Sequence, residues 1–427
     1  MKINEIKKLI NNGAFDEKFV ALYDASAVLF QRNRYLLALD SFADIFGGER
    51  EVNIYSVSGR SELAGNHTDH NCGKVIAASI NLDIIAVASS NGTTSINLKS
   101  EGYSLLNIDY TKYGMPDEKH FGTSASLIAG MVQGFLQNGH KVGGFDAYCT
   151  SSVLRGSGLS SSAAFEDMIG NILNYEFNGG TVPNVEIAQL AQYAENIFFG
   201  KPCGLMDQVA CAYGGIVSID FADTQSPKIE KIDFDLTKAG YNLCIVDTGG
   251  NHADLTDDYA SVPAEMKSVA ELLGNRVLRE CNKDEIIFRA TEIRAKCGDR
   301  AFMRAIHFFD ENNRVDIMKN GLQNGELNTY FEGVLASGKS SFCYLQNVYT
   351  TKNVSEQGLS LALCLTEGFM RDKNGAFRVH GGGFAGTIQA YIRENDVEEY
   401  RALMDSVFGE GACLVLRVRA HGAIKVN

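Results

Sequence analysis

A run of glycine and serine, Arg155-Gly-Ser-Gly-Leu-Ser-Ser-Ser-Ala-Ala164, constrains the fold of this chain more than any other feature. It follows a predicted strand at Phe145–Cys149 and opens a helix predicted to begin near Ser160. Glycines let the backbone approach an anion, and the first turn of a helix presents unpaired N–H groups at the positive end of its dipole. The run lacks the Gly-Lys-Ser/Thr ending of a Walker loop. Because it is long and leads directly into a helical Ala-Ala, we interpret it as a phosphate-binding loop of another kind, and not as a loop that only caps a helix.

Length and composition narrow the class of protein. A chain of 427 residues predicts two domains, and its 45% hydrophobic and 21% charged residues are typical of a globular protein. The formal net charge of −13 argues against a nucleic-acid partner, since duplex binding depends largely on Lys and Arg. The ten Cys include no Cys-x-x-Cys pair, which argues against structural zinc and against a disulfide framework. Most of them, Cys343 and Cys364 included, have apolar or Gly-rich neighbours, so we expect buried, reduced thiols. With no apolar leader and no stretch of about 18 apolar residues, we expect a cytoplasmic protein without a membrane partner.

Strand-like and helical segments alternate along the chain, which predicts an α/β or α+β protein. Residues 4–50 have helical spacing. Val75–Ile80 and Leu82–Ala88 resemble strands, and Asn91-Gly92 after them is a turn signal typical of a hairpin. The polar stretch Ala222–Lys231 contains one of only five prolines. We place a domain boundary there, which divides the chain into residues 1–222 and 223–427.

A second polar segment is Gly59-Arg-Ser-Glu-Leu-Ala-Gly-Asn-His-Thr-Asp-His-Asn71. Burying so many polar groups is costly unless they are paired. Paired, inward-facing polar groups are what a sugar site needs, because a sugar presents several hydroxyls in fixed directions. A surface turn is the simpler alternative. A zinc site at His67 and His70 is disfavoured, because the sequence offers no further ligands nearby.

Two more segments are candidates for the site. Glu195-Asn-Ile-Phe-Phe-Gly-Lys-Pro-Cys-Gly-Leu-Met-Asp-Gln208 presents Asp207 at the start of a predicted helix, where an ordinary N-cap is the alternative. Val379-His-Gly-Gly-Gly-Phe-Ala-Gly386 is a Gly-rich hairpin between predicted strands, suited to close passage of the backbone past a ligand or another loop.

In their order along the chain, these motifs resemble those of galactokinases, members of the superfamily that also contains homoserine, mevalonate and phosphomevalonate kinases. The resemblance rests on SGRSELAGNHTDHNCGKV, LRGSGLSSSAAFE and HGGGFAG, and it extends to AENIFFGKPCGLMDQ and DTGGNHADLTDDY. Together these segments span about residues 50 to 390. The resemblance implies an α+β fold of two domains: an N-terminal domain like domain 2 of ribosomal protein S5 and a C-terminal ferredoxin-like domain, with the active site between them.

The resemblance also implies an activity, the transfer of the γ-phosphoryl group of ATP to the C1 hydroxyl of galactose by a monomer that uses Mg²⁺. The implied catalytic residues are Asp207 and Arg60, and the implied metal ligands are Ser162 and Glu195. The implied sugar contacts are Arg60, Asn66, His67, Asp69, Gly204, Asp207 and Tyr259. The implied ATP-binding residues are Gly156, Ser157, Gly158, Leu159, Ser160, Ser161 and Ser162.

Physical chemistry is consistent with these roles. Phosphoryl transfer has a loose transition state, so positioning and charge stabilisation account for most of the catalysis. Asp207 would accept the proton of the attacking hydroxyl. Arg60 would lower the pKa of Asp207 and face the developing phosphoryl charge. A hydroxyl and a carboxylate are ligands that Mg²⁺ prefers.

The chain departs from the galactokinase pattern in the sugar motif. Asn66 replaces a Glu that contacts the C6 hydroxyl in galactokinases, Glu62 replaces an Asn, and His70 replaces a Tyr. An amide can donate where a carboxylate only accepts, so a kinase of galacturonate, arabinose or N-acetylgalactosamine is an alternative. A catalytically silent sugar-sensing regulator is disfavoured, because every implied catalytic group is present. In the third motif His380 replaces Thr and Ala385 replaces Gly, and the added methyl can crowd a tight backbone passage.

Overall fold

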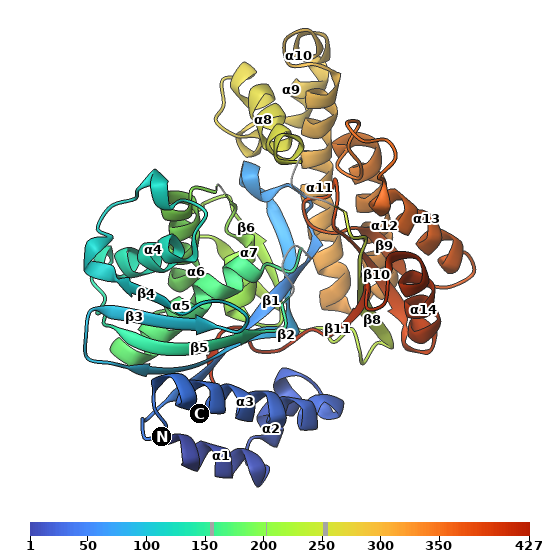
Figure 1. The fold of residues 1–427 in the computed structure, drawn as a ribbon. Coiled ribbons are helices and arrows are strands. Elements are labelled where there is room, and N and C mark those ends of the chain that lie inside the picture. The colour runs from blue at the N-terminus through green and yellow to red at the C-terminus, as the bar shows by residue number, and fades with distance from the viewer. Residues whose placement is uncertain (154–157, 202, 251–254) are drawn as a thin grey trace.

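In the part of the chain that the computed structural model describes, residues 1–153, 158–201, 203–250 and 255–427, two β-sheets covered by helices form two lobes (Figure 1). Within these residues the larger sheet has eight strands, with β12-β1-β2-β5-β3-β4 in order and β6 pairing with both β2 and β7. The smaller sheet has the order β11-β8-β10-β9. Strands β3 and β5 run parallel, whereas the other pairs are antiparallel. The strands of the larger sheet are β1 (Asn53–Ala64), β2 (Lys74–Ser90), β3 (Ser95–Ser100), β4 (Leu106–Asp109), β5 (Phe145–Ser151), β6 (Ile216–Asp220), β7 (Lys228–Ile232) and β12 (Ile424–Lys425).

Helices cover both faces of the larger sheet, which explains why β2 is apolar along most of its length. Ile84 and Ala86 of β2 belong to a core with the helices of one face, whereas Ile85 and Val87 belong to a core with the helices of the other. The helices of the first face are α4 (Ser124–Gln137), α5 (Ser161–Phe177), α6 (Asn184–Tyr193) and α7 (Met206–Tyr213). Those of the second face are α1 (Ile3–Asn11), α2 (Asp16–Leu22) and α3 (Val28–Phe46), at the bottom of Figure 1.

The second lobe is built on the smaller sheet and on one long helix, α11 (Asp299–Asn324), that runs beside it (Figure 1). Near one end, α11 packs with three shorter helices: α8 (Thr256–Leu272), α9 (Lys283–Phe288) and α10 (Ala290–Cys297). The other helices of this lobe are α12 (Leu327–Ser340), α13 (Gly358–Met370) and α14 (Val397–Phe408). Its strands are β8 (Tyr241–Asp247), β9 (Ala376–Val379), β10 (Thr387–Arg393) and β11 (Cys413–Leu416).

The C-terminal segment returns to the first lobe. β12 pairs with β1 along the edge of the larger sheet. Just before β12, the fully buried guanidinium of Arg419 lies 3.0 Å from the carboxylate of Asp83, which Arg34 contacts from α3 at 2.6 Å. Burial raises the pKa of Asp83, but these two arginines and the hydroxyls of Ser56 and Tyr23 outweigh it and lower the pKa overall. A paired buried charge therefore ties the chain end to β2 and α3.

The predicted α+β class is confirmed, and so are the strand before and the helix after the Ser-rich run, residues 155–164. The predicted hairpin at Asn91-Gly92 is wrong, because β5 lies between β2 and β3, and the two predicted strands before it form the single strand β2. Strands β7 and β12 lie beyond residue 222 and still pair into the larger sheet, so a boundary at that residue does not separate the two sheets.

All the described cysteines are free, but Cys343 and Cys364 are exposed, contrary to the prediction of burial. No helix among the described residues is long and apolar enough to cross a membrane.

Candidate active site

An ion pair between Arg60 and Asp207 lies at the centre of the candidate site. Arg60 comes from β1, and Asp207 comes from the first turn of α7. The guanidinium Nε and Nη2 donate to Asp207 Oδ1 and Oδ2, each at 2.7 Å, in a parallel two-bond geometry that fixes both groups. The third nitrogen, Nη1, donates to the carbonyl of Gly158. The structure therefore brings the two predicted catalytic residues together beside the described end of the Ser-rich loop.

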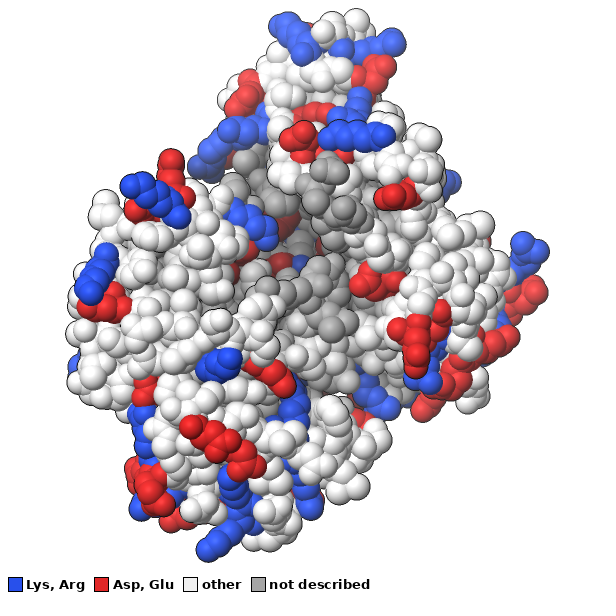
Figure 2. All heavy atoms as spheres, viewed as in Figure 1, with Lys and Arg blue, Asp and Glu red and all other residues white. Residues whose placement is uncertain are grey.

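The surroundings of Asp207 favour its ionised form. Burial by itself would raise the pKa of Asp207, but the charge and hydrogen bonds of Arg60, the hydroxyl of Ser160 and the charge of Lys201 lower it below its usual value. The side chain of Asp207 is 32% exposed, so the carboxylate remains open to a hydroxyl that approaches from outside. Figure 2 shows that the molecule is hollowed between the lobes and that acidic and basic side chains lie on the floor of this hollow. A charged, oriented and accessible carboxylate is suited to accept a proton.

The described part of the Ser-rich loop enters α5 through two residues in the left-handed region. Gly158 has φ +71° and Ser160 has φ +59°, and α5 begins directly after them. Glycine adopts this conformation freely, whereas serine does so at a cost, and such strain is common at functional sites. The carbonyl of Leu159 accepts from the N–H of Arg60 at 3.1 Å, which ties the loop to β1. Two of the predicted phosphate-binding residues lie outside the described part of the chain: Gly156 and Ser157.

The same loop passes close to the second lobe. A Cβ on Gly158 would lie 3.1 Å from Thr387 Oγ1 and 3.2 Å from His380 Nδ1, so a side chain at this position would crowd both. His380 Nδ1 hydrogen-bonds Thr387 Oγ1 at 2.9 Å, and its Nε2 hydrogen-bonds Ser61 Oγ at 3.1 Å. Burial lowers the pKa of His380 well below its usual value, with a further contribution from the charge of Arg60. His380, which replaces a Thr of the family pattern, is therefore a neutral bridge between β1 and β10.

Ser162 and Glu195 lie together, as the metal-site prediction requires. Ser162 Oγ is 3.4 Å from Glu195 Oε1, and Gln208 Nε2 donates to the other carboxylate oxygen at 2.9 Å. The Glu195 side chain is 3% exposed, so its orientation is fixed by the interior. Among the described residues no group of three or more His, Cys, Asp or Glu side chains could enclose a metal ion. One carboxylate and one hydroxyl fit Mg²⁺, which usually completes its coordination with phosphate oxygens and water. Lys201 Nζ lies 3.0 Å from Glu195 Oε1, a contact that the sequence did not reveal.

Asn66 has its polar side-chain atoms engaged by other protein groups. Its Nδ2 donates to the carbonyl of Gly381 at 2.6 Å and to the carboxylate of Glu62 at 3.2 Å. Its Oδ1 accepts from Asn347 Nδ2 at 2.8 Å and from Ser341 Oγ at 3.3 Å. These partners fix the orientation of the amide, and the residue is 1% exposed. The expectation that the Asn66 amide is available to donate to C6 of a sugar therefore does not fit this arrangement.

The carboxylate missing from position 66 is present four residues earlier. Glu62 accepts from Arg378 Nη2 at 2.6 Å, and both side chains are buried. Burial raises the pKa of Glu62, and Arg378 offsets part of that effect. The charge of Glu62 is thus balanced by an arginine of β9, so the pair links β1 to the second lobe.

Three predicted sugar-binding residues contact successive backbone carbonyls of the glycine run, Gly381 to Gly383. Asn66 Nδ2 donates to the carbonyl of Gly381, as described above. His67 Nε2 hydrogen-bonds the carbonyl of Gly382 at 2.9 Å, and the Tyr259 hydroxyl donates to the carbonyl of Gly383 at 2.7 Å. Since a carbonyl only accepts, His67 carries its proton on Nε2, and its buried Nδ1 is an acceptor that has no hydrogen-bond partner among the described residues. Burial lowers the pKa of His67 to about 3, so the ring is neutral.

Asp69 and Gly204 also lie side by side. A Cβ on Gly204 would be only 1.9 Å from Asp69 Oδ2, so the carboxylate depends on a glycine at that position. The side chain of Asp69 is 12% exposed. The structure therefore gathers the implied sugar contacts around the loop after β1, the start of α7 and the glycine run.

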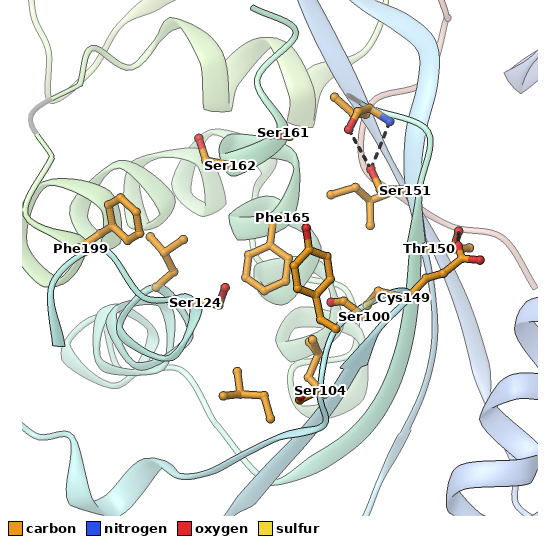
Figure 3. A pocket seen from close by; sticks show the side chains of 18 residues that line it. Ser100, Ser104, Ser124, Cys149, Thr150, Ser151, Ser161, Ser162, Phe165 and Phe199 are labelled. Atoms are coloured by element: carbon orange, nitrogen blue, oxygen red, sulfur yellow. Dashed lines mark hydrogen bonds between the residues drawn. The ribbon is translucent and has the colours of Figure 1, made fainter. Parts of the chain in front are cut away.

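A cavity of about 890 Å³ opens beside the Ser-rich loop (Figure 3). Ser161 and Ser162 of α5 lie at its edge, and the rings of Phe165 and Phe199 line it together with Leu98 of β3. The cavity walls come from β3, β5, α4 and α5, and their order along the chain gives no common motif. The sequence therefore did not predict this cavity.

Comparisons with known proteins agree with this geometry. The family model described as GHMP kinases N terminal domain matches residues 126–215, and the one described as Galactokinase galactose-binding signature matches residues 40–90. The chain resembles a crystal structure of Lactococcus lactis galactokinase complexed with galactose with a TM-score of 0.78 and 24% identity, over 92% of this chain and 100% of that one. A mevalonate kinase structure from Methanococcus jannaschii matches with a TM-score of 0.60 and 16% identity, over 86% of this chain and 98% of that one.

The fold and the site together define a small-molecule kinase of the GHMP class. Among curated relatives, the galactokinase of Lactococcus lactis subsp. lactis is 27% identical over 90% of this chain and 94% of its own length. The galactokinase of Actinobacillus pleuropneumoniae serotype 3 is 29% identical over 86% of this chain and 92% of its own length. The galactokinase of Streptomyces coelicolor is 28% identical over 89% of this chain and 94% of its own length. The chain is similar to these galactokinases over most of its length and most of theirs.

Proposed function

We infer that this protein is an ATP-dependent sugar 1-kinase that transfers the γ-phosphoryl group of ATP to the C1 hydroxyl of galactose. The observation that carries this conclusion is the Arg60–Asp207 pair, with two hydrogen bonds of 2.7 Å, set beside the N-terminus of α5. It joins a general base and a fixed positive charge to an anion-binding helix start, which are the parts that phosphoryl transfer needs.

In the proposed mechanism Asp207 accepts the proton of the C1 hydroxyl as that oxygen attacks phosphorus. Arg60 keeps Asp207 ionised and faces the charge that develops on the transferred group. The backbone N–H groups at the start of α5 and the hydroxyl of Ser161 hold the phosphates, because the Ser160 hydroxyl donates to Asp207. The cavity beside them, of about 890 Å³, is large enough for the base and ribose of ATP.

The sugar is held by residues of the loop after β1 and their neighbours. His67 Nδ1, a buried acceptor that no other described residue contacts by a hydrogen bond, takes a hydrogen bond from a sugar hydroxyl. Asp69 accepts from a second hydroxyl beside Gly204, and Tyr259 borders the site from α8. Asn66 acts through the loop backbone, because its own side chain is engaged by Glu62 and the glycine run.

Ser162 and Glu195 would hold Mg²⁺, which supplies charge neutralisation of the ATP phosphates when bound. We propose further that residues 1–222 form mainly the S5-like domain and residues 223–427 mainly the ferredoxin-like domain, with the active site between them. The tight approach of Gly158 to Thr387 and His380 supports this position. The free thiols support a reducing compartment, so we propose the cytoplasm.

The alternative of a galacturonate kinase rested on a donor at position 66. Both hydrogens of the Asn66 amide are directed at protein acceptors, so that argument loses its basis. The family matches favour galactose.

Asp207→Asn tests the proposed activity. The substitution keeps shape and removes charge, so turnover should fall by about 10²–10⁴ while galactose still binds. The measurement is ADP release with galactose, galacturonate, arabinose or N-acetylgalactosamine, with Asp372→Asn at an exposed position as the matched control. Turnover of Asp207→Asn within a few-fold of wild type would remove Asp207 from the base role, and wild-type enzyme inactive on galactose would overturn the proposed function.

A further inference from the structure

Lys201 occupies the carboxylate oxygen that the proposed metal site needs. Lys201 Nζ lies 3.0 Å from Glu195 Oε1, the same oxygen that faces Ser162 Oγ at 3.4 Å. The other oxygen of Glu195 is held by Gln208. The ammonium group and a metal ion bound between Ser162 and Glu195 would therefore require the same oxygen.

The backbone brings Lys201 to this position. Residues Ala194–Phe199 form a π-helical turn that ends at Gly200, whose φ of +80° reverses the chain. The N–H of Lys201 then donates to the carbonyl of Glu195 at 3.1 Å. A Cβ on Gly200 would lie 2.2 Å from the ring of Phe121, so the turn also depends on glycine for space. Lys201 is thus placed over Glu195 by main-chain geometry as well as by charge.

The two partners differ in how freely they move. The Glu195 side chain is 3% exposed, whereas that of Lys201 is 62% exposed. A buried carboxylate is costly without a countercharge, and Lys201 supplies one. Because the ammonium group is on a flexible stem that reaches solvent, it can leave without disturbing the interior.

We propose that Lys201 is a built-in competitor of Mg²⁺ at Glu195, and that it sets the Mg²⁺ concentration at which the metal–nucleotide complex binds. The proposal rests on the proposed function, in which Ser162 and Glu195 hold the metal. Two cations cannot share Glu195 Oε1 without strong repulsion. Mg²⁺ therefore displaces Lys201, and the free energy of the Lys201–Glu195 contact is subtracted from metal binding.

Lys201→Met tests the competition, because it keeps an unbranched apolar stem and removes the charge. We would measure equilibrium binding of a fluorescent ADP analogue as a function of Mg²⁺, with no turnover. The expected result is half-saturation at about 3- to 10-fold lower Mg²⁺ than for wild type, with wild-type affinity for the nucleotide at saturating Mg²⁺. Lys201→Arg, which keeps the charge, and Lys238→Met, at a position 86% exposed and paired with Asp235, should behave as wild type.

Two results would overturn the proposal. An unchanged Mg²⁺ titration for Lys201→Met would mean that the lysine does not compete. Weaker nucleotide binding at saturating Mg²⁺ would mean that Lys201 binds the phosphates instead. Glu195→Gln separates this inference from the proposed metal site: if it leaves the titration unchanged, the metal site itself is misplaced. If Glu195→Gln raises the Mg²⁺ requirement while Lys201→Met changes nothing, only the competition is refuted.

Discussion

Asn66→Glu would restore the residue of the galactokinase pattern, and the structure predicts that this restoration is harmful. The new carboxylate would lie, buried, against that of Glu62, whose oxygens are 3.2 Å and 3.4 Å from Asn66 Nδ2. At about 3.5 Å and an effective dielectric constant of about 20, two like charges repel by about 5 kcal/mol. The lost donation to Gly381 costs about 1–3 kcal/mol more. Arg378, 2.6 Å from Glu62, offsets part of this, so we expect a net loss of roughly 3–5 kcal/mol of folding stability.

Asn66→Gln is the matched control, because it has the length of Glu and keeps the amide. Chemical denaturation at about pH 7.5, followed by circular dichroism, should give Asn66→Glu a clearly lower midpoint than Asn66→Gln. Adding Glu62→Gln to Asn66→Glu removes the repulsion and should recover most of the loss. The reasoning is refuted if Asn66→Glu is as stable as Asn66→Gln and changes kcat/KM for galactose alone, because the side chain would then face the sugar.

Two further predictions follow from close contacts and from buried histidines. Gly204→Ala places a Cβ 1.9 Å from Asp69 Oδ2, so the carboxylate must move. We expect kcat/KM for galactose to fall by about 10- to 100-fold while KM for ATP is unchanged. An equal loss of kcat/KM for galactose and for ATP would contradict a sugar-side role. Burial lowers the pKa of His67 to about 3 and that of His380 well below its usual value, so both stay neutral while the unfolded chain gains protons below about pH 6.5. The free energy of unfolding should therefore fall by about 1.4 kcal/mol per pH unit for each histidine as the pH drops. Thermal melts between about pH 7 and pH 5 should show that the stability of His380→Thr falls less steeply with pH than that of wild type. Equal pH dependence in the two proteins would disprove the contribution of His380.

The sequence predicted the parts of the site whose chemistry is local. The Ser-rich run predicts the start of a helix, and α5 begins there. The sequence also predicts Asp207 at the start of a helix, and it lies in the first turn of α7. Pairing of Arg60 with Asp207, and of Ser162 with Glu195, was implied by the resemblance to galactokinases. No periodicity or spacing would have brought together residues so far apart in the chain.

The rest depends on partners that local sequence does not specify. The amide chemistry of Asn66 alone predicts a sugar contact, but its role follows from Gly381 and Asn347, which lie 315 and 281 residues away in the chain. Asn91-Gly92 lies between β2 and β3, but the hairpin predicted there is wrong. Whether strands on either side of a turn pair is decided by the whole sheet, and here β5 is inserted between them. The sequence does not indicate a role for Lys201, because an exposed lysine in a loop is common. Only its distance to Glu195 in the structure distinguishes it.

The return of the chain end to the first lobe has a consequence for biosynthesis. β1 begins at residue 53, whereas its neighbour β12 begins at residue 424. At synthesis rates of about 5–20 residues per second, roughly 20 to 70 s separate the two strands on the ribosome. Throughout that interval the outer edge of β1 is an open template for pairing with another chain, and Asp83 lacks Arg419. The nascent protein therefore carries this aggregation hazard until residues 419–425 are made, and the lobe that emerges first is among the last parts of the molecule to be completed.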